Sequence, residues 1–346
     1  MSTQNQLSGV LFGSAFGDAL AAPTEFMRDI QEIRRQFAPD GPTDIHQGHV
    51  TDDTQMMLAV ARALIAAPEL IAAPELIAAP ELTPQALEPA LRREFIAWLH
   101  DPENDRAPGH TCLTACRNLE RGGAWQVATV TQSKGCGANM RVQPMGFIAD
   151  DAGRAGAAQL QAALTHGHPT ALAAADLTAQ ALWLLLSGTE PGKLVNELTA
   201  YAQAQWMVYH QDWLGDLWQH YGASSPSTYI LEGWQECLVV LARLNDALTS
   251  GLPAAADPCD FTGEGWIAEE ALATGLLCFL LTPSDPLEAL RRAAVTKGDS
   301  DSLACLAGAF AGAHLGLSAF PAEWQTRIEY ADDLHQCAQA LKGALR

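Results

Sequence analysis

The chain has 346 residues, of which 48% are hydrophobic and 17% are charged, so it is long and apolar enough to bury a sizeable core. Acidic residues outnumber basic ones by 40 to 20, which leaves a formal net charge of −20. A surface this negative repels phosphate backbones and anionic lipids, so neither nucleic acid nor a membrane is an expected partner.

Helical periodicity predicts an all-α fold. Apolar residues recur at three- and four-residue steps along most of the chain, and few stretches alternate with the period of two that marks a strand. No long polar linker divides the chain, so we expect a single compact multi-helix domain over residues 1–346. The predicted helices span residues 7–21, 53–66, 84–99, 111–120, 136–149, 155–164, 170–187, 192–207, 229–249, 265–281, 286–294, 302–316 and 323–343.

Residues 65–82 read IAAPEL three times in succession. A six-residue period is too short for a solenoid repeat, and a proline in each unit prevents one continuous straight helix. Surface loops tolerate added length at little cost in free energy. We therefore expect an inserted loop or protrusion that follows the helix starting near Asp53.

The cysteine pattern and the absence of targeting signals indicate a cytosolic protein. The 8 cysteines include no C-x-x-C pair, which favours reduced, mostly buried thiols over a zinc site. The apolar residues 7–22 lack a preceding basic region, so they are not expected to be a signal peptide. No uncharged apolar run reaches the length of about 18 residues that a membrane span needs.

Two short acidic segments interrupt this apolar background. T-D-D-T at residues 51–54 precedes the apolar run 56–60, and G-D-S-D-S at residues 298–302 precedes the apolar run 303–308. Such residues can simply cap a helix, but paired carboxylates exceed what a cap requires. Carboxylates brought together repel unless cations neutralise them, and oxygen-only ligands suit Mg²⁺ or Mn²⁺. The pattern indicates a two-metal centre.

The segment from Gly9 to Phe26 combines small residues with two carboxylates. Small residues recur near one face of the predicted helix and allow close approach of another helix or a ligand. Asp18 and Glu25 lie at and beyond its C-terminal part, where the helix dipole disfavours negative charge. We expect Asp18 to accept hydrogen bonds from nearby backbone N–H groups. A role for Glu25 facing the metal site is as well supported as a structural one.

Two further motifs lie in the middle of the chain. G-C-G-A-N-M-R-V-Q-P at residues 135–144 begins with glycines that can present backbone N–H groups to a phosphate, and Arg141 could add a bidentate contact. T-H-G-H-P at residues 165–169 contains two histidines. We interpret the second motif as a loop that caps the helix beginning at Thr170 rather than as a metal site.

Taken together and in this order, the segments resemble the ADP-ribosylglycohydrolase family, which includes dinitrogenase-reductase-activating glycohydrolases and ADP-ribosylarginine hydrolases. The likeness runs across nearly the whole chain. It begins with G-x-x-x-G-x-A-x-G-D-A-L at residues 9–20 and includes the four motifs above together with residues 263–280.

The resemblance implies an all-α fold around a central cleft that holds two Mg²⁺ or Mn²⁺ ions. It implies Glu25 and Asp53 as candidates for accepting or delivering a proton, with Asp301 bridging the metals. The implied metal ligands are Thr51, Asp52, Asp53, Asp299, Asp301 and Ser302. The implied substrate-binding residues are Gly135, Gly137 and Met140, near pyrophosphate and ribose, and Trp266, stacked on adenine or else part of the core.

Two departures from the family pattern bear on the substrate. Lys297 stands where many relatives have glycine, and it could meet a phosphate or offset local negative charge. Residues 107–110 lack the aspartate of the D-x-G-N loop found in some arginine-specific relatives, and Asp101 or Asp105 could substitute for it.

The resemblance implies an enzyme that hydrolyses the bond between ADP-ribose and a modified protein side chain, with arginine as the first choice. Its partner would be an ADP-ribosylated protein, and the activity could give immunity against an ADP-ribosyltransferase toxin. The alternatives are hydrolysis of serine-linked ADP-ribose, poly-ADP-ribose or O-acetyl-ADP-ribose, or a non-catalytic protein that binds and blocks a toxin.

Overall fold

The computed structural model describes residues 3–67, 82–253 and 255–342. Within these ranges every regular element is a helix, and β pairing is limited to isolated bridges at Val130–His166 and Gly135–Ile267. The all-α prediction is therefore confirmed. Most of the IAAPEL repeat, residues 68–81, lies outside the described residues, so the predicted insertion stays a prediction.

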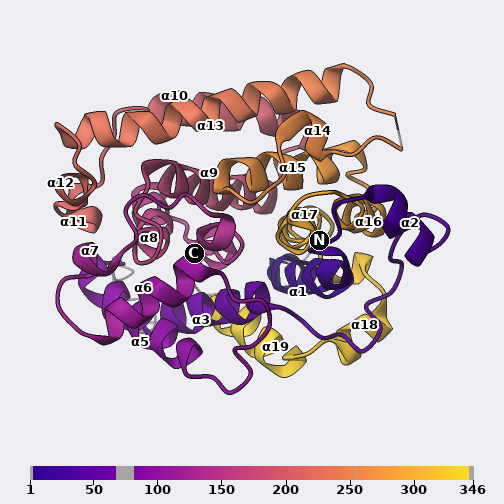
Figure 1. Ribbon diagram of the computed structural model, residues 1–346, viewed down its shortest axis with the longest axis horizontal. Coiled ribbons are helices and arrows are strands. Elements are labelled where there is room, and N and C mark those ends of the chain that lie inside the picture. Colours follow the sequence, from indigo (N-terminus) through magenta and orange to yellow (C-terminus); the bar gives the residue numbers. More distant parts are fainter. Residues whose placement is uncertain (1–2, 68–81, 254, 343–346) are drawn as a thin grey trace.

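Two antiparallel helices, α1 (Thr3–Ala21) and α17 (Ser300–Leu315), lie side by side in the fold (Figure 1). A Cβ added at Gly9 would lie 2.4 Å from the Gly312 carbonyl oxygen, and one at Gly13 would lie 2.3 Å from that of Gly308. Only glycine allows backbones to approach this closely. The small-residue face predicted from the sequence is thus a helix–helix contact.

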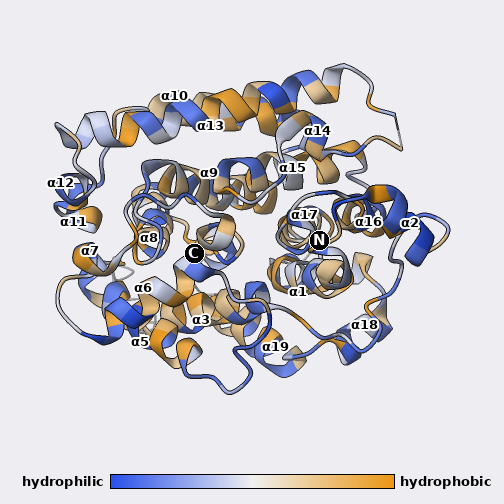
Figure 2. Cartoon of the chain, in the orientation of Figure 1, coloured by the Kyte–Doolittle hydropathy of each residue, from blue (hydrophilic) through white to orange (hydrophobic). Residues whose placement is uncertain are grey.

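Further helices surround this pair. The helices α15, α16 and α9 pack against α17, while α13 packs against α9 and α15, and α10 packs against both α13 and α9 (Figure 1). The bounds of these helices are α9 Pro169–Leu186, α10 Leu194–Gln205, α13 Pro226–Thr249, α15 Ala268–Leu281 and α16 Pro286–Ala294, and α8, which packs against α9, spans Asp151–Ala163. Hydrophilic and hydrophobic residues alternate along α10 and α13 (Figure 2), as expected for half-exposed helices.

On the opposite side, α3 (Asp52–Ala66) packs against α5 (Pro84–Leu99), and α5 packs against α6 (His110–Glu120). The helix α19 (Ala331–Ala340) contacts both α1 and α3 and so closes this side. The short elements are η1 Ala22–Thr24, α2 Ile30–Gln36, α7 Trp125–Ala128, η2 Cys136–Ala138, η3 Gln143–Phe147, η4 Pro191–Lys193, α11 Gln211–Leu214, α12 Leu217–Tyr221, α14 Cys259–Thr262, η5 Leu317–Ala319 and α18 Ala322–Arg327.

The predicted helix over residues 136–149 is wrong, because two 3₁₀ turns, η2 and η3, replace it. Pro144 has no N–H to donate to the carbonyl of Met140, as an α-helix would require. That carbonyl instead accepts from the Gln143 side-chain Nε2 at 2.6 Å and from the Cys305 thiol at 3.3 Å. Side chains therefore satisfy the backbone that a helix would have paired.

The predicted helix over residues 323–343 is also wrong, since it breaks into α18 and α19. Tyr330 has a positive φ of 57°, and this left-handed residue separates the two helices. The preceding Glu329 donates its backbone N–H to Gly48 O at 3.0 Å rather than to a helical partner. Pairing with a distant loop thus outweighs the local helical periodicity.

The helix α9 is long and apolar enough to cross a membrane by length and composition alone. However, 83% of its apolar stretch is buried within the protein, which is the behaviour of a core helix. The thiols agree with the sequence prediction, since all the cysteines are free and all but Cys136 are buried. The cytosolic location stays a prediction.

Candidate functional site

The contact between α1 and α17 brings the end of one helix to the start of the other. A Cβ added at Gly17 would lie 2.0 Å from the Ala304 carbonyl oxygen, near the N-terminus of α17. Just beyond α1, the Thr24 hydroxyl lies 2.9 Å from the Ser300 hydroxyl and donates to Ala294 O at 2.8 Å. Glu25, the next residue, therefore lies beside the second acidic segment.

Asp18 joins the first acidic segment to the same place. Its carboxylate accepts hydrogen bonds from Thr51 N at 3.0 Å and from Thr54 N at 3.1 Å, and the Thr54 hydroxyl donates to it at 2.5 Å. This fully buried side chain therefore fixes the N-terminus of α3 against α1. The prediction that Asp18 bonds to nearby backbone N–H groups is confirmed.

A cleft of about 310 Å³ opens where these segments meet. Every residue named above as an implied ligand, proton carrier or substrate contact lines it, except Thr51. Thr51 lies behind the cleft wall, where its hydroxyl accepts from Asp53 N at 3.2 Å and caps α3. The fold thus brings the implied residues together, while the roles assigned to them stay predictions.

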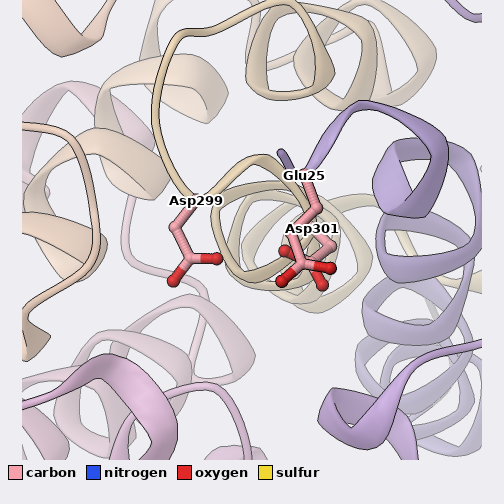
Figure 3. Close-up of side chains that lie close together, drawn as sticks. All are labelled: Glu25, Asp299 and Asp301. Carbon is pink, nitrogen blue, oxygen red and sulfur yellow. The ribbon is translucent and has the colours of Figure 1, made fainter. Parts of the chain in front are cut away.

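Three carboxylates in the cleft form a tight group. One oxygen from each of Glu25, Asp299 and Asp301 lies within 4.8 Å of the other two. Figure 3 shows Glu25 reaching down from the segment after η1, and the two aspartates at the start of α17. All three side chains are buried. The sequence indicated Glu25 as a proton carrier, and its place in this group makes it a neighbour of the implied ligands as well.

Burial raises the pKa of every carboxyl in the cleft, and for all of them except Asp301 the charges of neighbouring carboxylates raise it further. Burial, with the charges of Asp301, Asp52 and Asp18, raises the pKa of Glu25 to about 9. Burial and the charge of Asp301 likewise hold the pKa values of Asp52, Asp53 and Asp299 well above their usual range. Such a cluster ionises fully only when cations share the space.

The donor set fits hard divalent cations. Among the described residues that line the cleft, none is Lys or Arg, so no protein cation offsets the carboxylates there. The two acidic turns and Glu25 offer carboxylate and hydroxyl oxygens, which Mg²⁺ and Mn²⁺ prefer over the thiols and imidazoles that also line the cleft. The two acidic turns also touch directly, because the Ser302 hydroxyl donates to Asp53 Oδ2 at 2.9 Å.

The opposite wall of the cleft is the glycine turn that starts at Gly135. The N–H of Cys136 donates to Trp266 O at 3.1 Å, and Ala268 N donates to Lys134 O at 2.8 Å. These two bonds align the turn with the segment that carries Trp266. A Cβ added at Gly137 would lie 2.8 Å from the Cys112 sulfur, so the backbone there faces the cleft only because the residue is glycine.

Several lining residues were not predicted from the sequence. The Cys136 thiol donates to Asp299 Oδ2 at 2.7 Å, and Gly109 N donates to Asp52 Oδ2 at 3.4 Å. His166 lies beside the glycine turn, and burial together with the charge of Arg141 holds its pKa well below the usual range, so the ring is neutral. The other unpredicted lining residues are Phe26, Ala107, His110, Thr111 and Cys112.

The role of one histidine in the T-H-G-H-P motif was predicted correctly from the sequence. The His168 side chain accepts from Thr170 N at 3.2 Å and caps α9, as predicted. The neighbouring His166 turns the other way and lines the cleft. Residues two apart in an extended segment lie on the same side, so the local sequence does not predict that these two histidines diverge.

The predicted phosphate contact of Arg141 is wrong. Its guanidinium is fully buried and donates to the Gln161 side chain at 3.0 Å, to Gln161 O at 2.9 Å and to Thr165 Oγ1 at 2.7 Å. The ring of Phe95 lies 4.5 Å from its Cζ, so the charge is held inside the core behind the glycine turn. Arg141 supports the cleft wall and does not line it.

The charged residues considered as departures from the family pattern also lie outside the cleft. Lys297 forms an ion pair with Asp260, so it offsets local negative charge, which was one of its two predicted roles. Asp101 lines a separate small cavity beside Arg62, and Asp105 lines neither space. Neither aspartate takes the place of the one missing from residues 107–110.

Comparison with known proteins gives the same resemblance as the sequence motifs. The whole chain, residues 1–346, matches the ADP-ribosylglycohydrolase family. It is 26% identical to the ADP-ribosyl-[dinitrogen reductase] glycohydrolase of Rhodospirillum rubrum, over 78% of this chain and 91% of that protein. It is 24% identical to human ADP-ribosylhydrolase ARH3, over 97% of this chain and 91% of that protein.

A third relative is the ADP-ribosylarginine hydrolase Tri1 of Pseudomonas putida, 22% identical over 97% of this chain and 78% of that protein. Shorter matches span 43% of an Archaeoglobus fulgidus protein and 24% of Danio rerio ARH3, less than half of each. Among solved structures, an ADP-ribosylglycohydrolase-related protein complex superposes with a TM-score of 0.69 at 20% identity, covering 99% of both chains. At this identity the superposition supports the all-α fold alone.

Proposed function

Since the chain belongs to the ADP-ribosylglycohydrolase family, we propose that it removes ADP-ribose from modified arginine side chains of a protein substrate, with two Mg²⁺ or Mn²⁺ ions as cofactors. The names of the relatives support ADP-ribosyl glycohydrolase activity in general. The preference for arginine follows the Pseudomonas putida relative, which is named an ADP-ribosylarginine hydrolase.

The observation that carries the proposal is the composition of the cleft. Both acidic turns and Glu25 line it together with the glycine turn and Trp266. Carboxylates suit a reaction that needs proton transfer and hard cations, whereas glycine N–H groups and an aromatic ring suit phosphates and a base. Such a set of residues matches a substrate that carries both a nucleotide and the scissile bond.

We assign the cations to Thr51, Asp52, Asp53, Asp299, Asp301 and Ser302. When bound, two such ions would supply Lewis-acid polarisation of ribose hydroxyls and lower the pKa of a water. Thr51 does not line the cleft, but its hydroxyl oxygen, which accepts from Asp53 N, has a second lone pair that a cation could use. Asp53 and Ser302 already touch, so their oxygens can serve a shared site.

Glu25 and Asp53 are the proposed proton carriers. The Glu25 carboxyl lines the cleft within 4.8 Å of Asp299 and Asp301, so it is placed to deliver a proton to the departing arginine nitrogen. Asp53 lies in the same cleft and is suited to accept a proton from an attacking water. The narrow cleft limits bulk water around the reacting bond.

The test is incubation with arginine- and serine-ADP-ribosylated proteins, with and without EDTA. We expect release of ADP-ribose from arginine that requires Mg²⁺ or Mn²⁺ and is lost in Asp52→Ala and Asp301→Ala. Asp285→Asn is the control, because Asp285 caps α16 away from the cleft and asparagine also caps helices. Full turnover by both alanine variants would overturn the site.

A second candidate is hydrolysis of another ADP-ribosyl linkage, namely serine-linked ADP-ribose, poly-ADP-ribose or O-acetyl-ADP-ribose. It is favoured by the match to human ARH3 over 97% of this chain, since that name specifies no target residue. The missing aspartate at residues 107–110 points the same way. Faster release from serine than from arginine in the same assay would select this alternative. None of the relatives' names specifies a toxin, so the immunity role and a purely blocking protein stay predictions.

A further inference from the structure

Arg28 lies just beyond the cleft and touches three of the segments that build it. It follows Glu25 and Phe26 by two to three residues, and both of these line the cleft. Its guanidinium Cζ lies 4.4 Å from the centre of the Trp266 ring. Its Nη1 donates to Lys297 O at 3.4 Å, just before Asp299. One side chain thus connects the Glu25 segment, the Trp266 segment and the second acidic turn.

Trp266 lines the cleft, whereas Arg28 does not, and the Arg28 guanidinium lies over the Trp266 ring. The indole Nε1 is buried and has no hydrogen-bond partner among the described residues. The backbone of Trp266 is held by Cys136 N, but among these contacts only Arg28 acts on its ring.

The guanidinium is itself held in place. Its Nη1 lies 3.7 Å from Glu264 Oε2, two residues before Trp266. The backbone carbonyl of Glu264 accepts from Asp299 N at 2.8 Å, so the same loop is attached to the second acidic turn. Both contacts are made by Nη1 and lie outside the cleft lining, so the contact that joins Arg28 to the cleft is the one with the ring of Trp266.

We propose that Arg28 is a positioning residue that holds Trp266 flat against the cleft for stacking on the purine base of a nucleoside-diphosphate ligand. A cation over one face of an indole is attracted by its quadrupole and restricts the tilt of the ring. Bases stack on such a ring with a gain in affinity of roughly tenfold or more. The role rests on the proposed function, because that function supplies the adenine.

The proposed role predicts that Arg28 affects binding of the base but not binding of the sugar. The ribose and its hydroxyls would meet the carboxylates of the cleft, which are not among the contacts of Arg28 given above. Removing the guanidinium should therefore weaken a ligand that carries a base and leave one without a base unchanged. A general disturbance of the cleft would weaken both ligands together, because the Glu25 and Asp299 segments also meet Arg28.

The experiment is calorimetric binding of ADP-ribose and of ribose 5-phosphate, in Mn²⁺, to the wild-type protein and to Arg28→Met and Trp266→Ala. We expect Arg28→Met to weaken ADP-ribose binding about fivefold and to leave ribose 5-phosphate binding unchanged. Trp266→Ala should weaken ADP-ribose at least as much, and adding Arg28→Met to it should have no further effect. Arg28→Lys should recover part of the affinity, because an ammonium placed over the face of an indole is also attracted to it.

Arg93→Met is the matched control. The Arg93 side chain is 59% exposed and pairs with Glu94, whereas that of Arg28 is 56% exposed and pairs with Glu264. Unchanged ADP-ribose affinity in Arg28→Met would overturn the role of Arg28 and leave the proposed function standing. Equal loss for both ligands would overturn it in favour of a structural effect. If the wild-type protein binds no ADP-ribose, the proposed function fails and this role fails with it.

Discussion

The two acidic turns look alike in the sequence but are built differently. In the first, Thr51 caps α3 with its hydroxyl, and both aspartates lie inside the first turn of the helix. In the second, Asp299 occupies the capping position of α17 but makes no side-chain capping bond, and its carboxylate accepts from the Cys136 thiol instead. The capping interpretation therefore holds for the hydroxyl of the first turn and fails for the carboxylate of the second.

The two turns also differ in how their charges affect the pKa values of the neighbouring carboxyls. The charge of Asp301 raises the pKa values of Glu25, Asp52, Asp53 and Asp299, so it acts on both turns at once. Asp52 has an additional structural contact, because it accepts from Gly109 N across the cleft. The second turn is thus the electrostatic centre, whereas the first also holds a neighbouring loop. Unequal effects of equivalent substitutions would sharpen this difference.

The largest effect is expected for Asp301→Asn. The substitution keeps the shape of the side chain but removes the charge that faces the other carboxylates. We expect kcat to fall by about 10³-fold and Mn²⁺ binding to weaken beyond detection. Hydrolysis assays and a calorimetric Mn²⁺ titration would measure both, with Asp285→Asn as the control. Normal Mn²⁺ binding by Asp301→Asn would show that this turn is not the electrostatic centre.

Asp52→Asn should have a smaller effect on chemistry. The amide oxygen can still accept from Gly109 N, so the loop contact survives while the charge is lost. We expect kcat/KM to fall by about 10²-fold, less than for Asp301→Asn. The same assays in parallel would rank the two variants. A greater loss in Asp52→Asn than in Asp301→Asn would reverse the proposed order of the turns.

Ser302 tests the direct link between the turns. Ser302→Ala removes the hydroxyl that donates to Asp53, and we expect Mn²⁺ affinity to fall by about tenfold. Ser302→Thr keeps the hydroxyl and should retain most of the affinity. The comparison needs only the calorimetric titration. Equal affinities of the alanine and threonine variants would mean that the hydroxyl does not matter.

The smallest effect is a dependence of stability on pH. The pKa of Glu25 rises from 4.5 in the unfolded chain to about 9 in the folded, cation-free protein. Its proton therefore stabilises the fold fully below pH 4.5, and that contribution is lost as pH rises through about 9. Cations that share the cleft relieve the repulsion of the ionised carboxylates, so Mn²⁺ should raise Tm more at high pH than at low pH.

Thermal unfolding at about pH 6 and about pH 8.5, in EDTA or in Mn²⁺, would measure this dependence. We expect the two Mn²⁺-induced shifts in Tm to differ by at least about 2 °C. Glu25→Gln should reduce the difference, because it removes a carboxyl whose ionised fraction rises from the lower pH to the higher one. An Mn²⁺ shift that is the same at both pH values would contradict the electrostatic description of the cleft.

Much of the helix content could be predicted because apolar periodicity and capping are local properties. The helix α16 has its predicted bounds, residues 286–294, and the helix α3 begins one residue before its predicted start. Where the prediction fails, a distant group satisfies the backbone. The Cys305 thiol does so for the Met140 carbonyl within residues 136–149, and the Gly48 carbonyl does so near Tyr330. Such pairings leave no periodic signal in the sequence.

The candidate site shows the same division. The acidic turns were visible in the sequence because paired carboxylates exceed the need of a cap. Cys136 and His166 were not identified as cleft residues, because a thiol in a glycine turn and a histidine in a loop have many ordinary roles. Arg141 was assigned a ligand contact on the strength of its charge alone. Its burial against Gln161 and Phe95 depends on helices that the local sequence does not specify.

By itself, the sequence determined that the chain is helical, that two turns carry excess carboxylates and that one helix has a face of small residues. Only the tertiary structure decided where the carboxylates meet. Glycine and alanine let α1 and α17 pack backbone to backbone, and this contact brings Glu25 to within 4.8 Å of Asp299 and Asp301. The physical reason is that helix propensity acts over a few residues, whereas the repulsion among buried charges exists only once distant segments share a cleft.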